Sequence, residues 1–272
     1  MGKEFKSNFL TRSITALVIS VPIFGIVLFE NKILVLLTIL VTLFFAFHEW
    51  LKNSTSSSFV LNHMALLIFF ILLFLAPHKF AELTIFLSGV FWIIFSVFLI
   101  SNSTSKLYFV NFNNIFIRHL VIISFFLCSI YILEADNIFT FSNYILFLIF
   151  ILNSAISDSA AYLAGSNFGK NPLFSEISPN KTVEGFVGGI LFSTLFGGLI
   201  FALFNTTPLI IILMIAGSFY AFVGDYFFSF LKRKSGIKDT GNLLPGHGGI
   251  LDRIDSHLSS LPILTSILIL AF

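Results

Sequence analysis

The sequence contains few charged residues and a single cysteine. Lys, Arg, Asp and Glu make up 10% of the 272 residues, whereas 57% are hydrophobic. Because Cys128 has no second cysteine to pair with, an intramolecular disulfide and a cysteine-rich metal site are excluded. The net charge of +2 is too small to indicate a nucleic-acid-binding protein. The HExxH, GxSxG and GxGxxG patterns of zinc enzymes, serine hydrolases and dinucleotide-binding proteins are also absent.

Apolar segments long enough to cross a bilayer fill most of the chain. The mean hydropathy is +1.01, and 38 residues are phenylalanine. A run of about 18 or more apolar residues crosses a hydrocarbon core of about 30 Å. The sequence therefore predicts an all-α integral membrane protein with nine transmembrane helices. The predicted spans lie near residues 14–29, 33–49, 59–77, 81–100, 116–133, 141–164, 184–204, 208–230 and 257–272.

The basic residues are distributed unevenly between the predicted loops. With nine spans, thirteen of the 15 Lys and Arg residues lie on the side of the N-terminus, and only Lys32 and Lys79 lie opposite. Basic loops stay in the cytoplasm. We therefore expect a multi-pass protein of the cytoplasmic membrane with a cytoplasmic N-terminus. The first apolar run lacks a small-x-small cleavage site, so we interpret it as a retained span.

Polar chemistry gathers in the C-terminal half. We divide the chain into residues 1–140, a hydrophobic scaffold, and residues 141–272, a catalytic region with cytoplasmic loops 165–183 and 231–256. Asp225 follows the apolar stretch IILMIAGSFYAFVG, and a carboxylate at membrane depth usually faces a partner or a water-filled cavity. Ser229, Lys232 and Arg233 share its helical face. This face suits a metal with phosphates above it, or alternatively a structural ion pair between helices.

The stretch LPGHGGILDRIDS holds further candidates for phosphate and metal chemistry. Asp252 and Asp255 are helical neighbours, and Mg²⁺ is commonly held by one or two carboxylates together with substrate phosphates. Either acid alone is also explained by a favourable position in the first turn of a helix. Gly248 and Gly249 let backbone N–H groups approach an anion, and His247 is a donor or proton-transfer group. A plain interhelical loop is the alternative.

A second polar segment, SPNKTVEG, places Ser178, Lys181, Thr182 and Glu184 at the start of the seventh span. Its alternative interpretation is a helix entry with a snorkelling lysine. Asp158 is another predicted intramembrane acid. Together these residues predict a cytoplasm-facing pocket within the membrane, suited to a divalent metal, a polyphosphate and a lipid that enters from the side.

The stretch SFLKRKSGIKDTGNLLPGHGGILDRID resembles the signature of CDP-diacylglycerol synthases, also called phosphatidate cytidylyltransferases. SPNKTVEG and SDSAAYLAGSNFGK are similar to two further elements of that family. The positions that fill the signature are Ser229, Lys232, Arg233, Lys238, Asp239, Pro245, His247, Gly248, Gly249, Asp252, Arg253 and Asp255.

The resemblance implies that CTP and phosphatidate react to give CDP-diacylglycerol and pyrophosphate in the presence of Mg²⁺, alone or with a second ion. It implies a homodimer among membrane lipids, with the scaffold half as a candidate for the dimer contacts. It also implies that Asp225 and Asp252 hold the metal and that Lys181 joins them in catalysis. The expected substrate-binding residues are Ser178, Thr182, Lys232, Arg233, Lys238, Asp239, His247, Gly248, Gly249, Arg253 and Asp255.

Three alternatives remain at this point. One is a related membrane enzyme that acts on another lipid phosphate or on a polyprenol. Another is an ion-coupled transporter that uses Asp158 and Asp225, although no inverted repeat supports it. The third is a non-catalytic membrane scaffold.

Overall fold

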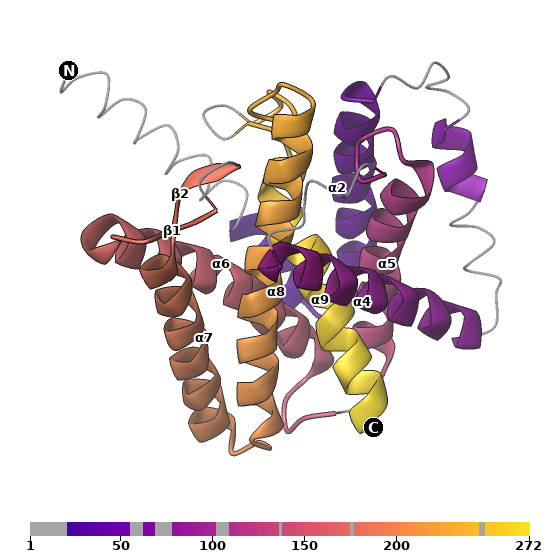
Figure 1. The fold of residues 1–272 in the computed structure, drawn as a ribbon. Coiled ribbons are helices and arrows are strands. Elements are labelled where there is room, and N and C mark those ends of the chain that lie inside the picture. The colour runs from indigo at the N-terminus through magenta and orange to yellow at the C-terminus, as the bar shows by residue number, and fades with distance from the viewer. Residues whose placement is uncertain are drawn as a thin grey trace.

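The structure, a computed structural model, describes residues 21–54, 62–68, 78–101, 109–135, 138–174, 177–244 and 248–272. Helices dominate this part of the chain (Figure 1). The long helices are α2 (Lys32–Lys52), α4 (His78–Ile100), α5 (Ile115–Glu134), α6 (Asn143–Phe168), α7 (Val183–Phe204), α8 (Leu209–Lys234) and α9 (Leu251–Ala271). The strands are β1 (Pro172–Phe174) and β2 (Ser178–Thr182).

Seven helices of the described residues are long and apolar enough to cross a membrane. The protein is therefore an all-α, multi-pass membrane protein, to which a small hairpin is added. Residues 21–28 and 62–68 are also helical. They lie within the predicted spans 14–29 and 59–77, whose remaining residues are outside the described ranges. The count of nine spans and their orientation stay predictions.

Polar residues at the edges of the apolar runs determine where several helices begin. The side chains of Asn31, Asn114, Ser142 and Thr182 each accept a hydrogen bond from the backbone N–H three residues later. Such caps satisfy N–H groups that have no partner within the helix. Helix α9 begins differently, because the residue before it is Ile250, which has no capping side chain.

Helix α9 lies at the centre of the bundle. It packs against α2, α4, α5, α6 and α8, and Figure 1 shows α4 crossing α8 and α9 at a steep angle. Its buried hydroxyl groups bond to neighbouring helices. Ser259 Oγ donates to the carbonyl oxygen of Tyr220 at 2.6 Å, and Ser260 Oγ lies 3.3 Å from Ser154 Oγ. The most central helix is therefore held by polar as well as apolar contacts.

Small residues let α6 and α7 approach closely. A methyl group on Gly188 of α7 would lie 2.5 Å from Ala164 Cβ of α6, and one on Gly189 would lie 3.0 Å from Ser157 Oγ. Ser157 Oγ in turn lies 2.6 Å from Ser218 Oγ of α8. Helix pairs within membranes rely on this kind of close contact because lipid is as apolar as the side chains.

The two predicted polar loops are shorter than expected. The region predicted as loop 165–183 contains the last turn of α6 and an antiparallel hairpin in which Pro172 pairs with Thr182 and Phe174 with Ser178. The second predicted loop, 231–256, is reduced to residues 235–250, because α8 continues to Lys234 and α9 begins at Leu251. The predicted helix ends were placed where the hydrophobic sequence stops, whereas α6, α8 and α9 extend into the polar sequence beside it.

We predict that Gly188→Ala lowers the thermal stability of the protein in detergent, because the new methyl group would overlap Ala164. Overpacking of this kind costs about 1–3 kcal/mol. Gly198→Ala in the same helix is the matched control, since a methyl group there meets no atom within 4 Å. Equal melting temperatures for the two variants would show that the close approach of α6 and α7 does not matter for stability.

Candidate active site

Lys181 and Asp225 form the first of two lysine–carboxylate pairs in the predicted site. Lys181 is near the end of β2, and its Nζ lies 2.9 Å from Asp225 Oδ2 on α8. The same ammonium lies over the rings of Phe222 and Tyr226, 4.8 and 5.8 Å from their centroids. The Asp225 side chain is still 36% exposed, whereas Lys181 Nζ is buried, so this pair is reached from outside the bundle through the carboxylate.

Lys232 and Asp252 form the second pair, which is more deeply buried. Lys232 Nζ, near the end of α8, lies 2.8 Å from Asp252 Oδ1 in the first turn of α9. Asp252 Oδ2 accepts hydrogen bonds from Thr240 N at 2.8 Å, Thr240 Oγ1 at 3.0 Å and Gly249 N at 3.1 Å. The Asp252 side chain is only 4% exposed, and both of its oxygens have partners within the protein.

Two further acids lie close to these pairs. Asp255 on α9 is buried, and Asp158 Oδ2 on α6 accepts a hydrogen bond from Ser256 Oγ at 2.9 Å. Asp158, Asp225 and Asp255 are close enough to repel one another electrostatically. Helices α6, α8 and α9 thus bring carboxylates into one region of the bundle, where a bound cation is electrostatically favoured.

The chemistry of this donor set suits Mg²⁺. Mg²⁺ prefers oxygen ligands and uses one or two protein carboxylates, completing its shell with water and phosphate. Within the described ranges, no group of three His, Cys, Asp or Glu side chains forms a ready-made metal cage. Asp225 and Asp252 each contact a lysine instead. The assignment of these two residues as metal ligands stays a prediction.

Comparison with known proteins identifies the family of the chain. The profile of the cytidylyltransferase family matches residues 10–271. The chain belongs to this family. The resemblance to CDP-diacylglycerol synthases inferred from the sequence is confirmed, because curated relatives carry the name phosphatidate cytidylyltransferase.

Three of these relatives come from different bacteria. The protein from Aquifex aeolicus is 48% identical over 138 residues, that from Bacillus subtilis 41% over 149 residues, and that from Staphylococcus saprophyticus 45% over 130 residues. The matched regions are 49%, 53% and 47% of this chain and 49%, 54% and 49% of the respective relatives. The chain therefore spans about half the length of the curated relatives it matches.

In this cytidylyltransferase-family chain, Leu244 and Gly248 approach each other shortly before α9. Leu244 N donates to Gly248 O at 3.0 Å. Gly248 has a φ of +83°, a backbone conformation that residues other than glycine rarely adopt. Gly249 N, predicted to meet an anionic ligand, donates to Asp252. His247 and Pro245 lie outside the described residues, so the predicted role of His247 stays a prediction.

The remaining predicted residues surround the two pairs less closely. Thr182 Oγ1 caps α7 by accepting from Gly185 N at 3.1 Å, and Ser178 begins β2. Arg233 Nη1 donates to the carbonyl oxygen of Ile237 at 3.3 Å. Exposed side chains that lie near the turn and the start of α9 belong to Arg233, Lys238, Asp239 and Arg253. The cationic side chains among them are exposed at the surface, where an anionic ligand can reach them.

Sequence analysis missed two residues of the site, Glu49 and Thr240. Glu49 on α2 is 3% exposed, and its carboxylate accepts hydrogen bonds from Ile250 N at 3.0 Å and Leu251 N at 2.8 Å. Thr240 Oγ1 lies 3.2 Å from Glu49 Oε2. The signal for Glu49 was the same as for Asp225, an acid at the end of an apolar span, but it lay in the half assigned to the scaffold.

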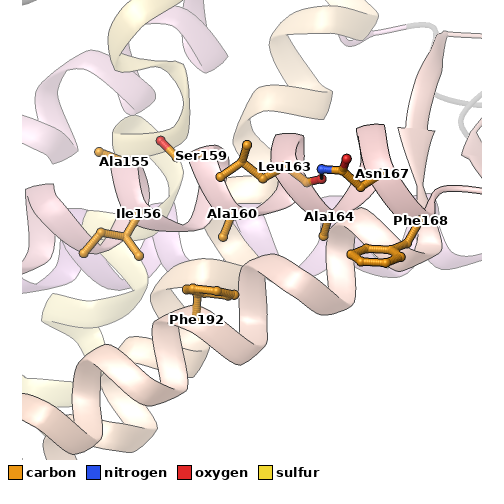
Figure 2. A pocket seen from close by; sticks show the side chains of 9 residues that line it. All are labelled: Ala155, Ile156, Ser159, Ala160, Leu163, Ala164, Asn167, Phe168 and Phe192. Atoms are coloured by element: carbon orange, nitrogen blue, oxygen red, sulfur yellow. Dashed lines mark hydrogen bonds between the residues drawn. The ribbon is translucent and has the colours of Figure 1, made fainter.

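An apolar groove runs along α6. It encloses about 480 Å³ between α6 and α7 and is lined mainly by alanine, isoleucine, leucine and phenylalanine side chains (Figure 2). Ser159 and Asn167 are its polar lining residues.

We predict that Lys232→Ala destabilises the protein strongly, whereas Arg233→Ala leaves its stability nearly unchanged. Removing Lys232 leaves Asp252 buried without its counter-ion, which costs about 3–5 kcal/mol. Arg233 is exposed, so its loss uncovers no buried charge. Thermal unfolding in detergent compares the two neighbours. A melting temperature of Lys232→Ala equal to that of Arg233→Ala would contradict a buried ion pair.

Proposed function

We propose that the protein transfers a cytidylyl group from CTP to phosphatidate, giving CDP-diacylglycerol and pyrophosphate. The observation that supports this most directly is the pairing of two lysines with two intramembrane aspartates, Lys181 with Asp225 and Lys232 with Asp252. A site for two phosphate-bearing substrates needs cations for their phosphates and carboxylates for a metal ion, and both are supplied here. Membership of the cytidylyltransferase family supports the same reaction.

The reaction is an in-line displacement. An oxygen of the phosphatidate phosphate attacks the α-phosphorus of CTP, a P–O bond forms, and pyrophosphate leaves with the electrons of the bond that breaks. Asp225 and Asp252 would hold Mg²⁺, whose positive charge would offset the negative charge of the triphosphate and of the leaving pyrophosphate. The main work of the protein is to position both substrates and neutralise their charge, so no covalent nucleophile is required.

The lysines exchange their partners when the substrates bind. In the free protein Lys181 and Lys232 neutralise carboxylates that would otherwise lie unpaired in an apolar bundle. Bound phosphates would take over the two ammonium groups, and the two carboxylates would then be available to hold a metal ion, so that the charges would stay balanced. Arg233, Lys238 and Arg253 add positive charge near the exposed edge of the site.

The lipid substrate enters from the side of the bundle. The groove between α6 and α7 is lined mainly by apolar side chains and runs along the helix that also carries Asp158, which suits a lipid whose acyl chain lies in the groove. The site opens to the cytoplasm, where CTP is found, and the protein lies in the cytoplasmic membrane as a homodimer. The bias of basic residues toward one set of loops supports this orientation.

The test is pyrophosphate release by the purified protein in detergent with CTP, phosphatidate and Mg²⁺. We expect release that depends on both substrates and that stops with EDTA. Asp225→Asn should lower the rate by at least about 100-fold, because a neutral amide holds a divalent cation far less well.

Folding of Asp225→Asn must be checked by thermal unfolding, so that loss of activity is not loss of structure. Release by the variant at the wild-type rate would remove the metal role of Asp225. No release by folded wild-type protein would contradict the proposed reaction and direct the search to other nucleotides and lipid phosphates.

A further inference from the structure

The carboxylate of Glu49 joins the scaffold half of the chain to the start of α9. Glu49 lies near the end of α2, about 200 residues before the backbone groups it binds, and it is 3% exposed. Both of its oxygens accept hydrogen bonds, Oε1 from Ile250 N and Oε2 from Leu251 N. None of the ion pairs formed by the described residues includes Glu49. Its counter-charge is the positive N-terminal end of the α9 dipole.

Glu49 replaces the cap that α9 lacks. The first N–H groups of a helix have no partner within the helix, and Ile250 offers no capping side chain. In this structure Gly249 N bonds to Asp252 within α9, and the next two N–H groups bond to Glu49. The first turn that carries Asp252 is therefore positioned by a residue of another helix.

Two glycines flank the place where this carboxylate enters. A methyl group on Gly241 would lie 2.5 Å from Glu49 Oε1, and one on Gly249 would collide with Glu49 Oε2. Larger residues at either position would push the carboxylate away from α9. The absence of a side chain at Gly241 and Gly249 leaves space for the Glu49 carboxylate. This explains both glycines without a bound ligand.

Thr240 connects Glu49 with Asp252. Its hydroxyl oxygen lies 3.2 Å from Glu49 Oε2 and 3.0 Å from Asp252 Oδ2, and its N–H donates to Asp252 Oδ2 at 2.8 Å. A second residue at the end of α2 also contacts Thr240, because Asn53 Nδ2 donates to Thr240 O at 2.8 Å. A displacement of Glu49 would therefore be transmitted to Asp252 through one side chain and one turn.

We infer that Glu49 is a positioning residue that holds Asp252 and the turn before α9 in the geometry needed for transfer. This inference rests on the function proposed above. It gives the N-terminal half a direct part in the site, although Glu49 itself need not touch a substrate. A shift of about 1 Å in a reacting arrangement costs about 100-fold in rate.

Glu49→Gln tests the inference with almost no change in shape. The amide keeps one acceptor oxygen but turns an NH₂ group toward a backbone N–H, so the start of α9 loses one of its two hydrogen bonds from α2. We expect kcat to fall about 100-fold and the Mg²⁺ concentration for half-maximal rate to rise at least about 10-fold. Glu49→Asp keeps the charge on a shorter arm, and we expect it to recover part of the rate.

Hydrogen exchange provides a readout that needs neither substrate nor metal. In Glu49→Gln the amides of Ile250 and Leu251 should exchange faster than in the wild type, while α7 exchanges as before. Glu134→Gln is the matched control, because Glu134 pairs with Lys32 away from the site, and it should change neither exchange at α9 nor the Mg²⁺ dependence.

Three outcomes would overturn the inference. One is unchanged exchange at Ile250 and Leu251 in Glu49→Gln. Another is unchanged kinetics in that variant. The third is a loss of folded protein with kcat and Mg²⁺ dependence unchanged per folded molecule, which is the result of a purely structural role. If wild-type protein releases no pyrophosphate, the proposed function fails, whereas faster exchange in Glu49→Gln would still establish the link from α2 to α9.

Discussion

The need to neutralise carboxylates inside an apolar bundle governs the centre of this protein. An unpaired charge away from water is costly, so it must be matched by an opposite charge or by several hydrogen-bond donors. Asp225 and Asp252 are matched by lysines, and Glu49 is matched by the N–H groups at the start of α9. Because these partners come from α2, α8, α9 and the β2–α7 junction, satisfying the charges also determines how the helices meet.

Close packing and polar bonding support each other in this arrangement. Glycine and alanine bring α6 against α7, and the hydroxyl pairs Ser157–Ser218 and Ser154–Ser260 connect α6 with α8 and α9. Hydrogen bonds of this length form only between helices that are already close. In lipid, a hydroxyl group without a partner in the protein finds few other hydrogen-bond partners. The acid region of α6 is therefore held near α8 and α9 by contacts that begin one helical turn away from Asp158.

The sequence predicted the membrane class and most acids of the site, because long apolar runs and isolated intramembrane carboxylates are strong local signals. It did not predict that Lys181 pairs with Asp225, since this contact depends on a hairpin that turns the chain between α6 and α7. The ends of α8 and α9 were misplaced because hydropathy falls before the helices stop. Glu49 carried the same signal as Asp225 but was missed because it lies in the half assigned to the scaffold, and nothing in the sequence relates it to its backbone partners about 200 residues away.

The glycine turn illustrates why residue type alone is an ambiguous guide to function. A glycine next to a helix start can bare its N–H for an anionic ligand or make room for a side chain of the protein. Gly248 has the positive φ that a tight turn requires, whereas Gly241 and Gly249 leave space for the Glu49 carboxylate. The anionic group at the start of α9 is thus the Glu49 carboxylate of the protein itself. Under the proposed function, substrate phosphates would then fall to cations such as Lys232, which pairs with Asp252, and the exposed Arg253.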